Sequence, residues 1–139
     1  PFVITSGIAF VSPHLSSEDD ILPLTDTAPR KSEQTALEFV NQGVQVSVVR
    51  LPPSVHGEGD HGFIPCLIGI ARSKGYAGYL LDGSNVWSTV HRLDAAKLYV
   101  KAIEKPPNIP IIHAIAEQVQ VKAIVDIIGK NLNIPAKGL

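Results

Sequence analysis

Short β-branched runs alternate with amphipathic stretches along the chain, and this alternation restricts the possible fold more than any other feature. Residues 2–5 and 44–50 are apolar and rich in valine or isoleucine, which is typical of buried parallel strands. Apolar residues at helical spacing predict helices over residues 30–42, 63–74, 92–104 and 121–132. Strands that alternate with helices indicate βαβ units, so we expect an α/β fold around a mainly parallel sheet.

The remaining segments of the chain give weaker indications of short strands and loops. Residues 79–81 are a short strand candidate, and residues 109–115 are a strand that Pro110 confines to a sheet edge or to the strand start. The segment 12–31 is rich in proline and acidic residues, and the segment 51–62 is rich in glycine. Both segments are therefore predicted to be surface loops.

Composition limits the class of protein. A chain of 139 residues has room for one compact domain, so we expect a single domain over residues 1–139. A net charge of −1 argues against a nucleic-acid partner or a membrane surface, and we expect a cytoplasmic protein. The single cysteine, Cys66, excludes an internal disulfide framework and any cysteine-based zinc site. Methionine is absent and the chain opens at Pro1 on an apolar run, so we expect the carboxy-terminal portion of a longer protein.

Three motifs carry a family resemblance. They are VRLPPSVHG at residues 49–57, FIP at residues 63–65 and VHRLDAA at residues 90–96. In this order they resemble the second half of extended short-chain dehydrogenase/reductases, the NAD-dependent epimerase/dehydratase family, and most closely an atypical branch of it. The resemblance covers essentially the whole chain.

The resemblance implies a partial Rossmann-type fold. Residues 2–5 would be the fifth strand of its parallel sheet and residues 44–50 the sixth, followed by the small substrate-binding elements of the family. The glycine-rich fingerprint that binds the cofactor pyrophosphate would precede Pro1, so NAD or NADP would be bound by the full-length parent. This chain would line the nicotinamide end of the cofactor with Thr5, Ser6, Gly7, Leu51, Pro52 and Pro53.

The usual catalytic set of the family is not present at the matching positions. The family uses a Ser or Thr after the fifth strand and a Tyr-x-x-x-Lys motif in the next helix. Gly7 stands at the serine position, Thr25 near the tyrosine position and Pro29 near the lysine position. The candidate catalytic residues that remain are Ser6, the nearest hydroxyl, and His56, an imidazole that could act as a general acid.

The resemblance also suggests the substrate and the assembly. Trp87 stands where relatives that act on nucleotide sugars often hold an arginine that clamps the diphosphate, so a small carbonyl or enol substrate is expected instead. The substrate-binding residues would be His56, Phe63, Ile64, Leu67 and Trp87. The helix at residues 30–42 corresponds to one that often forms a dimer interface in the family, so a homodimer is expected.

Several other residues have competing interpretations. The segment 56–61 holds two histidines and two carboxylates, which could bind a metal, but a glycine-rich surface turn explains it as well and no metal is expected. The pair His91 and Asp94 is expected to be structural, at the start of a helix. His113 and Cys66 are expected to be core residues.

Two functions from different classes follow. The first is an NAD(P)-dependent oxidoreductase or epimerase-like protein that acts on a small carbonyl-containing substrate without the usual Ser-Tyr-Lys set. The alternative is a non-catalytic NAD(P)-binding sensor or scaffold, or a fragment without activity of its own.

Overall fold

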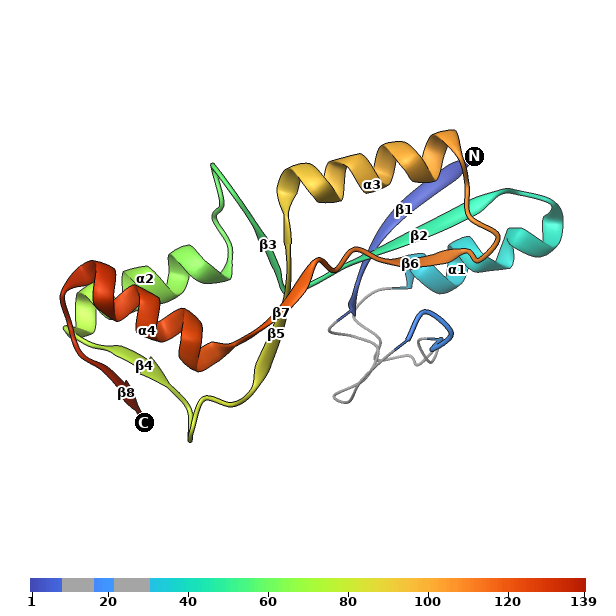
Figure 1. The fold of residues 1–139 in the computed structure, drawn as a ribbon. Coiled ribbons are helices and arrows are strands. Elements are labelled where there is room, and N and C mark those ends of the chain that lie inside the picture. The colour runs from blue at the N-terminus through green and yellow to red at the C-terminus, as the bar shows by residue number, and fades with distance from the viewer. Residues whose placement is uncertain (9–16, 22–30) are drawn as a thin grey trace.

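The computed structural model describes residues 1–8, 17–21 and 31–139 (Figure 1). The helices are α1 (Ser32–Glu38), the 3-10 helix η2 (Val40–Gln42), α2 (Phe63–Lys74), α3 (Arg92–Glu104) and α4 (Val121–Leu132). The strands are β1 (Phe2–Gly7), β2 (Val46–Leu51), β3 (Ser54–His56), β4 (Ala77–Tyr79), β5 (Val86–His91), β6 (Ile111–His113), β7 (Glu117–Gln120) and β8 (Ala136–Gly138).

The first sheet confirms the expected parallel arrangement. Its order is β1-β2-β6, and both pairings are parallel, with Phe2 opposite Val46 and Val48 opposite Ile111. The expected strands at residues 2–5 and 44–50 therefore run side by side in the same direction. The strand predicted over residues 109–115 is β6, which lies at the edge of this sheet and begins one residue after Pro110, because the proline ring has no N–H to pair.

Side-chain alternation places one helix on each face of this sheet. Ile4, Val48 and Ile111 are in register and pack on Ala36 of α1 in one buried cluster. On the other face, the Thr5 hydroxyl forms a 2.6 Å hydrogen bond with the Tyr99 hydroxyl of α3. Figure 1 shows α1 and α3 on opposite sides of the sheet, which is the layered arrangement that a parallel sheet needs.

The long helices form where the sequence predicts them. Helices α2, α3 and α4 have the expected bounds, and Gly75 and Asn133 end α2 and α4 in the left-handed conformation. The first predicted helix is shorter than expected. Residues 30–42 contain α1 and the 3-10 turn η2, with the left-handed Gly43 as the final residue of the turn.

The short strands differ from the predictions. The predicted strand at residues 79–81 was wrong in position, because Leu81 has a positive φ of 53° and only residues up to Tyr79 are extended. The predicted loop at residues 51–62 contains β3, which pairs in parallel with β5. Strands β7 and β8 were not predicted, and β7 runs antiparallel to β5.

A second core lies beyond the β3-β5-β7 sheet. Ala71 of α2, Ala77 of β4 and Val121, Val125 and Ile128 of α4 form a buried cluster there, with Trp87 of β5 packed against it. Helices α2 and α4 lie together at the end of the molecule away from α1 (Figure 1). Among the described residues, no helix is long and apolar enough to cross a bilayer.

Candidate functional site

The carboxyl ends of β1 and β2 lie next to each other and carry the residues expected to bind the cofactor. Ser6 is in register with Arg50 and Gly7 with Leu51, and Pro52 and Pro53 follow directly. Ligands of open α/β sheets bind outside this edge, so the structure brings these positions to one place. Ser6, however, is only 4% exposed and lies on the α1 face, whereas Thr5 is exposed and faces α3.

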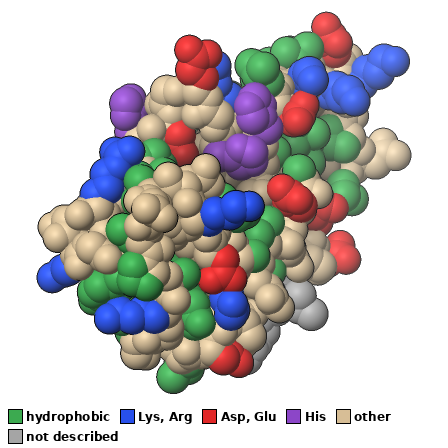
Figure 2. Space-filling model, turned by 60° about the vertical axis from the view of Figure 1, so that its left-hand side comes forward, with side chains coloured by type: hydrophobic (Ala, Val, Ile, Leu, Met, Phe, Trp, Pro, Cys, Tyr) green, Lys and Arg blue, Asp and Glu red, His purple; other side chains and the backbone are tan. Residues whose placement is uncertain are grey.

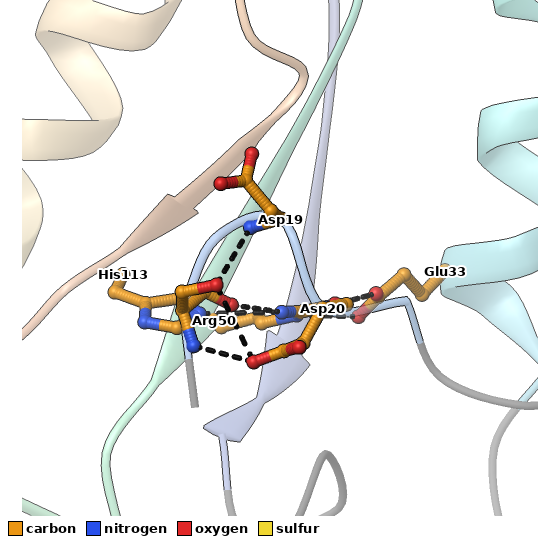
Figure 3. Close-up of polar contacts among 6 residues, drawn as sticks. Asp19, Asp20, Glu33, Arg50 and His113 are labelled. Carbon is orange, nitrogen blue, oxygen red and sulfur yellow. Dashed lines mark hydrogen bonds and ion pairs between the residues drawn. The ribbon is translucent and has the colours of Figure 1, made fainter. Parts of the chain in front are cut away.

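A fully buried arginine is present at the same edge, and the sequence analysis missed its role. The Arg50 side chain has no exposed surface and forms an ion pair with Glu33 of α1, which is also buried. The Arg50 Nε donates to both carboxylate oxygens of Glu33 at 3.2 Å, and its Nη2 donates to Oε1 at 2.5 Å (Figure 3). A buried guanidinium requires such a partner, because an unpaired charge in the protein interior is strongly unfavourable.

The same guanidinium fixes the segment 17–21 across the ends of β2 and β6. The backbone carbonyl oxygens of Asp20 and Ser17 accept from Arg50 at 2.6 and 3.5 Å. The Glu18 carboxylate accepts a 2.7 Å hydrogen bond from the backbone N–H of His113 on β6. The segment 17–21 is thus anchored to the sheet at three points, all close to the strand ends, and Figure 3 shows Asp20 beside Arg50.

His113 completes this group as a neutral imidazole. Its Nε2 lies 3.2 Å from the Arg50 Nη1, and because arginine can only donate, Nε2 is the acceptor and the ring proton is on Nδ1. Burial, with a further contribution from the positive charge of Arg50, lowers the pKa of His113 below its ordinary value. The expected core imidazole is therefore half-buried and has a hydrogen-bond partner.

The sequence contains a signal for this group. Arg50 follows a run of valines that predicts a buried strand, and a charge in a buried strand implies an acidic partner. The glutamate in the first turn of the preceding helix, Glu33, is that partner. The third and fourth members, Glu18 and His113, lie far from Arg50 in sequence and could not be assigned without the fold.

A second group of side chains lies on the β3-β5 sheet. The rings of His56 and His91 meet edge to face with 5.4 Å between their centroids, and those of Phe63 and Trp87 stack at 3.7 Å. On the face drawn in Figure 2, histidine side chains lie close together beside acidic and basic groups. Three of the expected substrate residues, His56, Phe63 and Trp87, are therefore on or against the same small sheet.

The other two expected substrate residues are placed differently. Ile64 lines a groove of about 410 Å³ between α2 and α4, and Leu67 packs against the second hydrophobic core. Leu67 lies one helical turn after Phe63 in α2 and, like Trp87, packs against that core. Their role in substrate binding stays a prediction.

The loop between β3 and α2 is a tight turn. Gly57 and Gly59 have positive φ angles of 142° and 79°, and the Asp60 carboxylate accepts a 2.7 Å hydrogen bond from the Gly62 N–H. Glu58 forms a solvent-exposed ion pair with Arg92 at 3.6 Å. Within the described part of the chain, no three histidine, cysteine or acidic side chains converge on a point where a metal ion would be held.

The structure also bears on the predictions for the His91–Asp94 pair and for Cys66. The Nδ1 of His91 accepts from the Leu93 N–H at the start of α3. Asp94 pairs with Lys97, whose hydrogen bond and positive charge lower the pKa of that carboxyl, so both residues are structural as expected. The prediction that Cys66 is buried was wrong, because it lies on the exposed side of α2. Thr25 and Pro29, the matches to the family's Tyr and Lys positions, are outside the described residues.

Comparison with known proteins gives relatives in sequence and in structure. No family model matches the chain. An uncharacterized protein of Schizosaccharomyces pombe is 44% identical over 97% of this chain and 47% of its own length. A second, from Saccharomyces cerevisiae, is 38% identical over 100% of this chain and 48% of its own length. The chain therefore spans about half the length of these curated relatives.

Solved structures with the same fold include dehydratases and an epimerase that were determined with NAD. A dTDP-glucose 4,6-dehydratase from Bacillus anthracis, solved with NAD, matches 99% of this chain and 48% of its own with a TM-score of 0.75 and 15% identity. A UDP-glucuronic acid 4-epimerase from Bacillus cereus, with UDP-glucuronic acid and NAD, matches 99% and 48% with a TM-score of 0.73 and 18% identity. These matches confirm the expected partial Rossmann-type fold, and they show the resemblance to the epimerase/dehydratase family at the level of the fold.

Proposed function

We propose that this chain is the carboxy-terminal half of an NAD(P)-dependent protein of the epimerase/dehydratase family, and that the whole protein transforms a small carbonyl-containing substrate. One observation carries the proposal: β1 and β2 are parallel and in register, so their carboxyl ends lie side by side. The fold of the chain also matches a dehydratase solved with NAD, with a TM-score of 0.75. The relatives in sequence are about twice as long as this chain, which leaves room for an amino-terminal half that holds the pyrophosphate.

The strand ends suit the nicotinamide end of a dinucleotide. Gly7 has no side chain to obstruct a flat ring, and Pro52 and Pro53 give a rigid backbone whose carbonyl groups can accept from the carboxamide. When bound, the cofactor would supply or accept a hydride. Thr5, Ser6, Gly7 and Leu51 would orient the ring at the edge of the sheet.

Proton transfer would fall to His56. Its imidazole lies against His91, whose Nδ1 is occupied by the Leu93 N–H, so the proton of His91 is on Nε2. An imidazole nitrogen of His56 can deliver a proton to a carbonyl oxygen as a general acid. Ser6 is a weaker candidate than the sequence suggests, because its side chain is nearly enclosed beside Arg50.

The test is whether the full-length protein oxidises NADH or NADPH in the presence of small aldehydes and ketones. The loss of absorbance of the reduced nicotinamide measures the turnover. Replacement of His56 with Asn is expected to lower turnover by about 10²–10⁴-fold, the usual contribution of a general acid. The matched control is His61→Asn, which changes an exposed histidine in the loop that follows β3 and is expected to keep the activity. Turnover that survives in His56→Asn contradicts the role of His56.

A sensor or scaffold without turnover is the second candidate, and the burial of Ser6 favours it. This alternative predicts that the full-length protein binds NADH or NADPH in calorimetry but oxidises neither with any carbonyl compound. Steady turnover would eliminate it.

A further inference from the structure

The bridging segment, residues 17–21, is held against the sheet by hydrogen bonds to Arg50 and His113. The Arg50 guanidinium donates to two backbone carbonyl oxygens of the segment, at 2.6 and 3.5 Å. The backbone N–H of His113 donates to the Glu18 carboxylate of the segment at 2.7 Å. Ile21, the one large apolar residue of the segment, is 69% exposed. Polar contacts with two residues of the sheet therefore hold the segment, and burial of apolar surface contributes little.

The position of the Arg50 guanidinium depends in turn on a neutral His113. Its Nη1 atom lies 3.2 Å from Nε2 of the His113 ring, and the same Nη1 donates to the Ser17 carbonyl. Arginine has only donor groups, so this contact needs a lone pair on Nε2. A proton on Nε2 removes that lone pair and brings two positively charged donors together. Protonation of His113 therefore acts directly on the group that holds the bridging segment.

Charged groups from three elements act on the His113 ring, in addition to its burial. Burial is the largest effect and disfavours the protonated ring, and so does Arg50 of β2, whereas the carboxylates of Glu18, Glu33 and Asp20 favour it. Figure 3 shows His113 and Glu33 on opposite sides of the Arg50 guanidinium. The balance lowers the pKa of His113, so the folded arrangement takes up a proton less readily than a free imidazole does. By linkage, a proton favours the arrangement in which the contact with Arg50 is broken.

The bridging segment crosses the sheet at the edge where the cofactor is proposed to bind. Arg50 is in register with Ser6, and Leu51, the next residue, is in register with Gly7. The Arg50 side chain has no exposed surface, and Ser6 is only 4% exposed. Release of the segment would leave donors of this buried guanidinium without their acceptors, and would so loosen the strand end that carries Leu51.

We propose that His113 is a positioning residue that responds to protons: its neutral imidazole holds Arg50 in place, and its protonation releases the bridging segment from the strand ends and weakens nucleotide binding there. This inference rests on the proposed function and names a regulation of the same site. Nucleotide binding is expected to fall on acidification and to return at neutral pH.

The first experiment follows hydrogen–deuterium exchange of the full-length protein at about pH 7.5 and about pH 5, on either side of the ordinary pKa of histidine. In the wild type, the peptide that contains the bridging segment is expected to exchange about tenfold faster at the lower pH after correction for the intrinsic rate, which is the effect of about one lost hydrogen bond. Helix α4 contains no histidine and is the internal reference, because its protection is expected to stay unchanged.

His113→Gln is the matched variant, because its amide oxygen can accept from Arg50 and takes up no proton in this range. Its bridging segment is expected to stay protected at both pH values. His61→Asn removes an exposed histidine instead and is expected to respond as the wild type does. Equal pH responses of the wild type and His113→Gln overturn the inference. If His113→Gln does not fold, the wild type decides, because a segment whose exchange changes no more than that of α4 also overturns it.

The second experiment titrates NAD⁺ into the full-length wild type and His113→Gln by calorimetry at the same two pH values. The wild-type affinity is expected to fall by up to about tenfold at the lower pH, and that of His113→Gln is expected to stay constant. Release of the segment without a loss of affinity overturns the link to the cofactor site. Absence of NAD⁺ binding at both pH values defeats the proposed function, whereas the exchange result still decides whether His113 controls the segment.

Discussion

Arg50 organises its surroundings through all three nitrogen atoms of its guanidinium group. Its side chain is completely buried and bonds to a helix, to the segment 17–21 and to an imidazole on the adjacent strand. Each bond replaces a water molecule that the guanidinium loses on burial, so removal of any partner leaves a buried charge with less compensation. This group fixes the geometry of the strand ends where the cofactor is proposed to bind.

Replacement of Glu33 with Gln is the direct test of this ion pair. The amide cannot neutralise Arg50, so the free energy of unfolding is expected to fall by about 3–5 kcal/mol in urea denaturation. The matched control is Glu58→Gln, which removes an exposed ion pair with Arg92 and is expected to leave the unfolding midpoint unchanged. Equal midpoints for Glu33→Gln and the wild type would show that the buried pair contributes nothing.

His113 predicts a pH dependence of stability. Its pKa is lowered in the folded chain, mainly by burial, so below pH about 6.5 the unfolded chain binds a proton that the folded chain does not. Stability is therefore expected to decrease on acidification from about pH 6.5, until the folded-state pKa is reached. Urea denaturation of the wild type and His113→Gln across this range checks the prediction: the two curves are expected to differ below pH 6.5, and parallel curves contradict it.

Single residues could be placed from the sequence where the interaction that holds them is local. Asp94 was placed correctly because its stabilisation in the first turn of α3 depends only on the helix itself. Cys66 was misplaced because its side of α2 is decided by packing against α4, which the adjacent sequence does not encode. The Arg50 group was missed because it joins residues up to 95 positions apart, the separation of Glu18 and His113.

At the scale of the elements, two glycines in and before α2 can be compared, because one has a constrained backbone and the other does not. Gly57, in the loop before α2, has a φ of 142°, and an added Cβ would come within 3.0 Å of the His91 ring and the Arg92 side chain. Gly57→Ala is therefore expected to lower the free energy of unfolding by about 1–3 kcal/mol. Gly69 lies within α2, and a Cβ added there would have no atom within 4 Å. Gly69→Ala is therefore expected to raise the free energy of unfolding by up to about 1 kcal/mol. Thermal unfolding of both variants gives the comparison, and the same sign for both contradicts the account.

The helices and the short strands differ in how strongly the sequence encodes them. Helices α2, α3 and α4 each span at least 12 residues with an apolar stripe and an end signal, so local sequence is enough. Strands β3, β4 and β8 have three residues each and exist because a neighbouring strand pairs with them. Such short strands carry no periodicity of their own, which is why the β3-β5 face could not be assembled from the sequence.

At the scale of the whole molecule, the resemblance predicts a homodimer through the region of α1 and η2. Phe39, Val40 and Val44 are each about 40% exposed there, which is compatible with an interface. The full-length protein is expected to be a dimer in light scattering coupled to size-exclusion chromatography. Phe39→Glu is expected to give a monomer, with half the molar mass of the wild-type assembly. The control, Leu80→Glu, changes an exposed leucine far from α1 and is expected to stay dimeric. A wild-type monomer contradicts this prediction.

The assignment of the chain to a larger cofactor-binding fold is tested most directly by calorimetric titration of NADH and NADPH into the full-length protein. The account predicts one saturable site for at least one of the two nucleotides, and it predicts that Gly7→Leu, which places a side chain at the carboxyl end of β1, weakens binding at least tenfold while Gly69→Ala does not. A folded full-length protein that binds neither nucleotide would contradict the account.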